Sequence, residues 1–168
     1  MKNINYYDFE ICKLGIAEVD KKILRILFVN KNEYERSAAP GSVILDKDAF
    51  IVKETPLIKN AAAQLNEYFN GKRRKFDFPV MIRGTDFQID VWKALQKIPY
   101  GETRSYGEIA AIIGNPKASR AVGMANNRNP LPIVVPCHRV IGSNGKPVGY
   151  AGGLELKQIL LEIEKNKI

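Results

Sequence analysis

Histidine and cysteine are scarce in this chain, which has one histidine, His138, and two cysteines, Cys12 and Cys137, among its 168 residues. One imidazole and two distant thiols do not give the ligand spacing of a zinc site, and no clustered carboxylates offer an oxygen site. We therefore expect no metal and no cofactor. Two thiols so far apart also fit a reducing compartment, in which both stay free.

Long apolar runs are absent as well. No stretch is long enough to cross a membrane. Residues 1–20 alternate charged and apolar side chains and lack the apolar core of a secretion signal. The sequence therefore predicts a cytoplasmic protein with no membrane partner.

Acidic residues are outnumbered by basic ones. The chain has 26 Lys and Arg against 18 Asp and Glu, a formal net charge of +8. This balance favours a polyanionic partner such as nucleic acid, although many soluble proteins are basic and bind none. A hydrophobic fraction of 45% is ordinary for a soluble globular protein. The length allows one large domain or two small ones.

The first 80 residues are expected to form a β-rich domain. The alternating stretches YYDFEICKLGIAEVD and KILRILFV predict strands, with a hairpin turn at residues 20–22. Thr55-Pro56 predicts a helix start with proline in the first position, and Gly71 predicts its end. A change of composition at KRRKFDFPV marks a boundary between domains at 1–80 and 81–168.

The second domain is expected to consist of short helices. Thr85 with Gln88 and Ser105 with Glu108 each predict a capping box at a helix start. The second of these helices should stop at Gly114, and Asn115-Pro116 should start another at once. Two short helices joined by a Gly-Asn-Pro turn are typical of a helix-turn-helix, but also of any tight corner between helices.

The helix predicted in KASRAVGMANNRN is slim, with Arg120 as its one large cation in mid-helix. Glycine inside a helix costs about 1 kcal/mol relative to alanine, so Gly123 needs a compensating interaction. Close packing against another helix and close approach to DNA both explain the pattern, and the basic composition favours DNA. The small residues are Ala118, Ser119, Ala121, Gly123 and Ala125.

The stretch NPLPIVVPCHRV predicts a buried extended segment that runs into a glycine-rich loop. An imidazole beside a thiol can take its proton and so prepare a nucleophile. The Cys137–His138 pair is a weak signal alone, because successive side chains of an extended segment point to opposite faces. A buried structural cysteine beside a hydrogen-bonded histidine is the alternative. A final amphipathic helix should bury Leu156, Ile159, Leu160 and Ile163.

At these residues the chain resembles the O6-alkylguanine-DNA alkyltransferases, the methylated-DNA–protein-cysteine methyltransferases. The matching segments are TDFQIDVWKALQKIPYGETRSYGEIA, RAVGMANNRNPLPIVVPCHRVIGSNG and GYAGG. They cover nearly all of residues 85–153, and PCHRV is the most specific element. The resemblance implies an α/β two-domain protein: a β-rich, ribonuclease-H-like N-terminal domain and a mostly α, winged-helix or helix-turn-helix-like C-terminal domain.

The resemblance also implies a reaction. An alkyl group on guanine O6 in DNA would move to Cys137. The thioether product would be permanent, so each protein molecule would react only once. His138 would take the thiol proton through a water and be oriented by Glu164. Tyr106 would donate a proton as guanine leaves, and Asn129 would brace the segment behind the cysteine. O4-alkylthymine is a second candidate substrate.

The resemblance assigns the DNA contacts and the base pocket in the same way. The slim helix would enter the minor groove, where Arg120 would fill the space of a flipped nucleotide. The resemblance implies that the partner is double-stranded DNA with O6-alkylguanine, bound by a monomer, with cooperative binding as a further expectation. The other expected DNA contacts are Ser105, Tyr106, Ser119 and Asn127. The residues expected to line the base pocket are Pro132, Val140, Tyr150, Ala151 and Gly152.

Some features depart from the family pattern. The single histidine cannot also serve the zinc site that some relatives have in their first domain. Ala151 stands where some relatives have a hydroxyl, and Asn126 and Asn127 replace bulkier residues on the groove-facing helix. Two alternatives to a suicide alkyltransferase remain: a non-catalytic module that binds alkyl lesions, and a small cysteine hydrolase.

Overall fold

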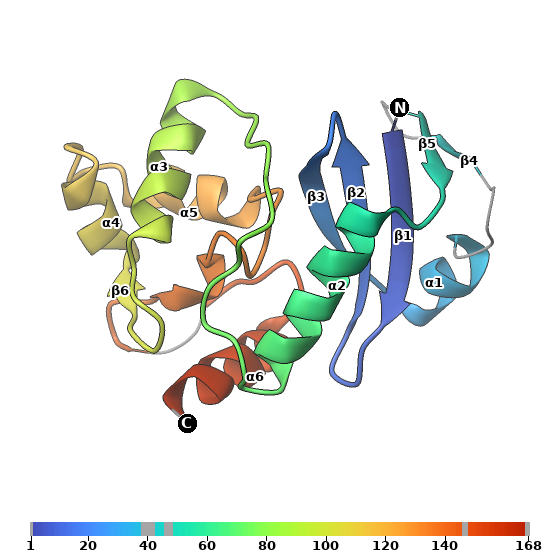
Figure 1. Cartoon of the computed structure of the whole chain (residues 1–168). Coiled ribbons are helices and arrows are strands. Elements are labelled where there is room, and N and C mark those ends of the chain that lie inside the picture. Colours follow the sequence, from blue (N-terminus) through green and yellow to red (C-terminus); the bar gives the residue numbers. More distant parts are fainter. Residues whose placement is uncertain (1, 38–42, 46–48, 146–147, 167–168) are drawn as a thin grey trace. The chain divides into compact units, whose positions relative to one another are not determined.

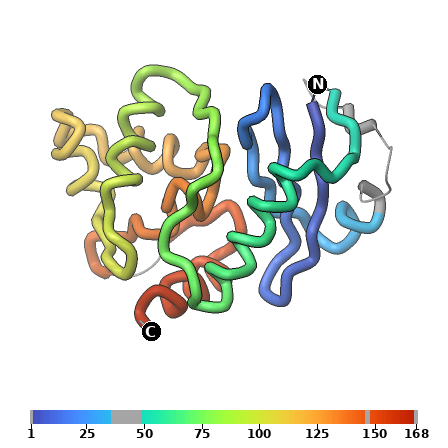
Figure 2. Tube along the Cα trace, viewed as in Figure 1, coloured from blue at the N-terminus to red at the C-terminus, as the bar shows by residue number. Residues whose placement is uncertain are grey.

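The structure is a computed structural model that describes residues 2–37, 43–45, 49–145 and 148–166 (Figure 2). The chain divides into two compact units, Met1–Met81 and Ile82–Ile168. Each unit is described by itself below. In the described residues, no helix combines the length and the apolar character needed to cross a membrane.

The N-terminal unit is built on a five-stranded mixed sheet (Figure 1). The strands lie in the order β3-β2-β1-β5-β4, with β1 parallel to β5 and all other neighbours antiparallel. Helix α2 packs against β1, β2 and β3. The element bounds are β1 Lys2–Asp8, β2 Lys13–Val19, β3 Lys22–Val29, α1 Lys31–Ser37, β4 Val43–Leu45, β5 Ala49–Val52 and α2 Pro56–Phe69.

Local signals in this unit work as the sequence predicts. Asp20 and Lys21 both take positive φ angles, which a tight hairpin between β2 and β3 requires. The Thr55 side chain accepts a hydrogen bond from the Ile58 N–H at 3.1 Å, so it caps α2, and proline stands at the first helical position. Gly71 follows the helix with a φ of 73°, the left-handed conformation common after helix ends.

The C-terminal unit is mostly helical and has a two-stranded parallel sheet of β6 and β7. Helices α3, α4 and α5 contact one another and form the helix-turn-helix region. The Trp92 indole of α3 donates to the Ala125 carbonyl of α5 at 2.9 Å, and this hydrogen bond ties the two helices to each other. The bounds are α3 Asp86–Gln96, β6 Arg104–Ser105, α4 Tyr106–Ile112, α5 Ser119–Asn127, the 3-10 helix η1 Cys137–Arg139, β7 Val140–Ile141 and α6 Leu154–Lys165.

The helix boundaries of this unit partly differ from expectation. Thr85 and Gln88 form the full capping box of α3. Ser105 caps α4 by accepting from the Glu108 N–H at 3.1 Å, which is one half of the expected box. The expectation of a helix directly after Asn115-Pro116 is wrong. The Ala118 N–H bonds back to the Asn115 carbonyl in a separate turn, so α5 begins at Ser119.

Candidate active site

The Cys137–Arg139 segment is a single turn of 3-10 helix, where the sequence predicted extended chain. The Cys137 N–H bonds to the Val135 carbonyl at 2.8 Å and the Arg139 N–H to the Pro136 carbonyl at 3.0 Å. These short-range bonds coil the chain immediately after Pro136. All three side chains of the turn are buried, and the objection that successive side chains must point to opposite faces no longer applies.

Glu164 on α6 is the acceptor at the centre of the site. Its carboxylate lies 2.5 Å from His138 Nε2 and 2.7 Å from Arg139 Nε, and it also accepts from the Gly101 N–H at 3.1 Å. Arg139 also donates to the Ile98 carbonyl at 2.7 Å. Glu164 is 1% exposed, so its charge is compensated by buried donors. The carboxylate therefore fixes the orientation of the imidazole.

The protonation states of this pair follow from burial and contacts. Burial alone would raise the pKa of Glu164, but the hydrogen bonds and charges of His138 and Arg139 outweigh it and hold that pKa well below its ordinary value. Burial lowers the pKa of His138, and this effect exceeds the opposing influence of Glu164. The imidazole is therefore neutral near pH 7. With a proton on Nε2 facing the carboxylate, Nδ1 is the nitrogen that can act as a base.

The Cys137 thiol is 4% exposed and needs help to ionise. Burial raises its pKa, while hydrogen bonds from Asn129 and Tyr150 and the positive charge of Lys157 lower it in part. The site thus combines a protonated thiol with groups that stabilise the thiolate once it forms. This arrangement suits a nucleophile that is activated only when a substrate is present.

Two asparagines hold the backbone around the cysteine. The Asn129 amide donates to the Val135 carbonyl at 2.7 Å and its side-chain oxygen accepts from the Leu131 N–H at 2.9 Å. Asn126 of α5 donates to the Cys137 carbonyl at 3.3 Å. These are the contacts that the bracing role expected for Asn129 requires, and the role itself stays a prediction. Asn126 was not among the expected site residues, although it joins α5 directly to the nucleophile.

Lys157 is the principal site residue that sequence reasoning missed. Its side chain is 0% exposed, and its ammonium donates to the carbonyls of Val140 at 2.6 Å, Val148 at 2.9 Å and Gly149 at 3.2 Å. Burial lowers the pKa of Lys157 to about 8. The predicted apolar face of α6 is therefore only partly correct. Leu156 and Leu160 are buried as expected, Ile159 and Ile163 are half-buried, and the other buried residues are Lys157, Leu161 and Glu164.

Tyr106 lies at the start of α4 and close to the thiol. Its hydroxyl donates to the Val148 carbonyl at 3.0 Å, the same oxygen that accepts from Lys157. Burial, with a smaller effect of Cys137, raises the pKa of Tyr106. The tyrosine is therefore a proton-bearing group beside the sulfur. In this structure its proton is directed at the protein backbone.

The expected DNA contacts lie on α4 and α5. Arg120 and Asn127 are exposed, and Ser119 is the half-buried first residue of α5. A Cβ added at Gly123 would meet the Tyr106 ring at 3.8 Å, an ordinary contact distance. Packing within the chain therefore does not require glycine at this position. Of the two explanations of the slim helix, this observation favours close approach by an external surface.

The residues expected to line the base pocket fall into two groups. Pro132 and Val140 are buried on either side of the η1 turn. Tyr150 and Gly152 are half-buried and Ala151 is exposed, in the segment before α6. The contact between Tyr150 and Cys137 joins the two groups. Their shared role around a base stays a prediction.

Comparisons with known proteins agree across the whole chain. Residues 4–82 match the family model described as 6-O-methylguanine DNA methyltransferase, ribonuclease-like domain. Residues 86–166 match the model described as 6-O-methylguanine DNA methyltransferase, DNA binding domain. The two models together span both structural units.

Individual relatives show the same similarity. A methylated-DNA--protein-cysteine methyltransferase of Methanosarcina barkeri is 56% identical over 97% of this chain and 99% of its own. A constitutive one of Bacillus subtilis is 59% identical over 96% of each chain. The crystal structure of the Mycobacterium tuberculosis O6-methylguanine methyltransferase superposes with a TM-score of 0.79 at 42% identity, covering 100% of this chain and 95% of that one. The chain therefore belongs to the methylated-DNA–protein-cysteine methyltransferase family.

Proposed function

We propose that this protein repairs alkylated DNA by moving a methyl group from guanine O6 to the sulfur of its own Cys137. The observation that carries the proposal is the buried Cys137 beside the His138–Glu164 pair, in a unit that matches the DNA-binding domain of the family. A solved relative from Mycobacterium tuberculosis, 44% identical over 97% of this chain and 92% of its own, with a TM-score of 0.79, is a complex with DNA.

The proposed reaction is an in-line displacement. The Cys137 thiol gives its proton to His138 through a bridging water, and the sulfur attacks the methyl carbon. A sulfur–carbon bond forms as the bond between that carbon and guanine O6 breaks, and the electron pair of the broken bond passes to the guanine. The guanine recovers a proton, so the products are unmodified guanine and S-methylcysteine.

Each side chain has a distinct part in this scheme. Glu164 keeps the His138 Nε2 proton in place and stabilises the imidazolium that forms, while Lys157 and Tyr150 stabilise the thiolate. Tyr106 supplies a proton to the departing guanine, for which its hydroxyl must leave the Val148 carbonyl. The product thioether has no carbonyl carbon for water to attack, so each molecule reacts once.

The target base must leave the helix before it can reach the thiol. Guanine O6 lies on the base-pairing edge, inside the stack, and the thiol is 4% exposed. Flipping a nucleotide out costs a few kcal/mol, and a side chain that enters the vacated stack replaces some of the lost contacts. Arg120, exposed in the first turn of α5, is the residue we assign to that insertion.

Intact mass spectrometry tests the proposal. Duplex DNA with one O6-methylguanine should add one methyl group per protein molecule, and peptide mapping should place it on Cys137. The Cys12→Ser variant should react like the wild type, and Cys137→Ser should stay unmodified. Unmodified wild-type protein that still binds the lesion would indicate a binding module. Repeated turnover on an ester or amide would indicate a hydrolase.

A further inference from the structure

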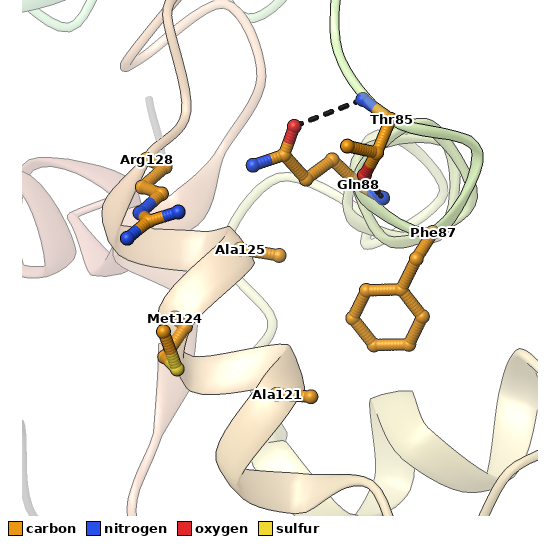
Figure 3. Close-up of a pocket in the computed structure, with 7 residues that line it drawn as sticks. All are labelled: Thr85, Phe87, Gln88, Ala121, Met124, Ala125 and Arg128. Carbon is orange, nitrogen blue, oxygen red and sulfur yellow. Dashed lines mark hydrogen bonds between the residues drawn. The ribbon is translucent and has the colours of Figure 1, made fainter.

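A cavity of about 220 Å³ lies between the first turn of α3 and the outer side of α5. It is open to solvent and lies within the C-terminal unit. In Figure 3, Phe87 extends from α3 toward the gap, and Ala121 and Ala125 point into it from α5. The residues that line it are Thr85, Phe87, Gln88, Ala121, Met124, Ala125 and Arg128.

The walls of this α3–α5 cavity are mainly apolar. Phe87 forms one side, and the two alanines leave room for a guest on the other. The Met124 side chain at its edge is 57% exposed and adds apolar surface to the mouth of the cavity. The Thr85 hydroxyl and the Gln88 side-chain oxygen are both used in the capping box of α3. The walls therefore suit a compact guest with an apolar surface.

The charged group at the cavity is Arg128, which follows the last residue of α5. Its side chain is exposed, and within the described residues its guanidinium makes no hydrogen bond or ion pair. None of the seven lining residues, all of them described, is acidic. A small hollow with apolar walls and one unpaired guanidinium matches a ring that packs through its C–H faces, with an anion beside it. This is the chemistry of a sugar–phosphate unit.

We propose that the α3–α5 cavity binds one deoxyribose of the DNA strand that flanks the lesion, with the neighbouring phosphate paired to Arg128. The inference rests on the proposed function, because it takes α5 as the helix that lies in the groove. Continuity along α5 supports it, since Arg120, Met124 and Arg128 follow one another at intervals of four residues. The cavity thereby continues the surface of α5 that carries Arg120.

The spacing sets where on the DNA this contact falls. Arg120 and Arg128 are eight residues apart, about 12 Å along a helix axis at 1.5 Å per residue. The phosphates of one strand advance about 3.4 Å per step along the DNA axis. With α5 taken as parallel to the DNA axis, we expect the bound sugar about three to four base-pair steps from the lesion, on one side only.

The test compares Arg128→Gln with Lys97→Gln as a matched control. Lys97 is exposed and caps the opposite end of α3, so its loss removes the same charge from the same unit away from the cavity. On a long duplex containing O6-methylguanine, Arg128→Gln should weaken binding several-fold and reduce the slope of log affinity against log salt by about one. Lys97→Gln should change both quantities much less.

Two further measurements make the assignment specific. Phe87→Ala removes the apolar wall that α3 contributes to the cavity without changing charge, and it should weaken duplex binding with an unchanged salt slope. Duplexes shortened from either end should remove the effect of Arg128→Gln when the shortening passes about four steps on one side of the lesion, but not on the other. Reaction with free O6-benzylguanine should keep its wild-type rate in all variants, which shows that they are folded.

The possible outcomes separate this inference from the proposed function. Equal losses in Arg128→Gln and Lys97→Gln, or effects that persist on duplexes shortened from both ends, would overturn the sugar–phosphate site and leave DNA repair intact. A changed state of self-association in Phe87→Ala, with duplex binding unaltered, would assign the cavity to a second copy of the chain instead. A wild-type protein that neither binds nor repairs the duplex would refute the proposed function itself.

Discussion

Replacement of Lys157 by methionine tests whether its buried ammonium holds in place the segment before α6 that contains Tyr150. Methionine keeps most of the length and apolar stem of lysine but removes the charge and all three hydrogen bonds, to the carbonyls of Val140, Val148 and Gly149. The Val148 oxygen retains the Tyr106 hydroxyl as a partner, so the other two oxygens lose most. We therefore expect the segment that contains Tyr150 to loosen.

The expected cost follows mainly from the Val140 oxygen, which is buried, because Gly149 is exposed and its oxygen can bond to water instead. A buried acceptor left without its partner costs about 1–3 kcal/mol, and the substitution also relieves the cost of burying an ammonium. A net loss of about 2 kcal/mol is expected, which lowers the Tm of a protein of this size by roughly 4–8 °C. Because the Lys157 charge lowers the pKa of Cys137, its loss should leave less thiolate and so also slow reaction with free O6-benzylguanine.

Thermal denaturation and the single-turnover rate are the two measurements, with Lys165→Met as the matched control. Lys165 lies on the same helix and is exposed, so its replacement should leave both quantities close to the wild type. Hydrogen exchange should place the change in Lys157→Met at residues 148–152. A Lys157→Met protein with wild-type Tm and wild-type rate would refute the reasoning, because the three hydrogen bonds would then contribute nothing.

Three further predictions concern other parts of the C-terminal unit. Arg120→Ala should slow repair of duplex DNA strongly but leave the rate with free O6-benzylguanine nearly unchanged, and equal losses on both substrates would place Arg120 in the chemistry or the fold. Because the pKa of Glu164 is lowered on folding, its stabilisation is present above the ordinary value of 4.5 and declines as the pH falls below it. The free energy of unfolding, measured with urea from pH 3 to 7, should depend less on pH in Glu164→Gln than in the wild type. An identical pH dependence would show that this carboxylate does not stabilise the fold. Gly84→Ala should destabilise by about 1–3 kcal/mol, since the new Cβ would lie 2.6 Å from the buried Trp92 ring, whereas Gly107→Ala, whose Cβ meets neighbours at 3.8 Å, should be neutral or slightly stabilising in the same assay.

The parts of the fold that could be predicted are those set by short-range chemistry. Thr55 and Thr85 cap their helices because a threonine oxygen three residues before an N–H needs no distant partner. The hairpin at Asp20 and Lys21 is likewise a local event. Cys137 and His138 were only a weak pair in the sequence, and the resemblance to a family supplied their roles. Glu164 was identified through that resemblance alone, since no spacing rule places a carboxylate 26 residues from its imidazole.

The parts that could not be predicted depend on distant contacts. A lysine on an amphipathic helix is usually expected at the surface, and Lys157 is buried only because three carbonyls from two other segments converge on it. The η1 turn follows a β-branched run that favours extended chain, but Cys137 and Arg139 bond to carbonyls two and three residues back. Asn126 is one of two adjacent asparagines, and only the packed structure shows which of them reaches the Cys137 carbonyl.

The burial of Cys137 makes the protein a reporter of its own folded fraction. A general thiol reagent such as iodoacetamide reacts slowly with a sulfur that is 4% exposed, and more readily once unfolding exposes it. O6-benzylguanine requires the assembled site and should label only the folded form. In a Cys12→Ser background both reagents modify the same sulfur, O6-benzylguanine in folded molecules and iodoacetamide mainly in unfolded ones. The ratio of their products on Cys137 would count folded and unfolded molecules in a mixture, even in a crude extract where no spectroscopic signal could be assigned to this chain.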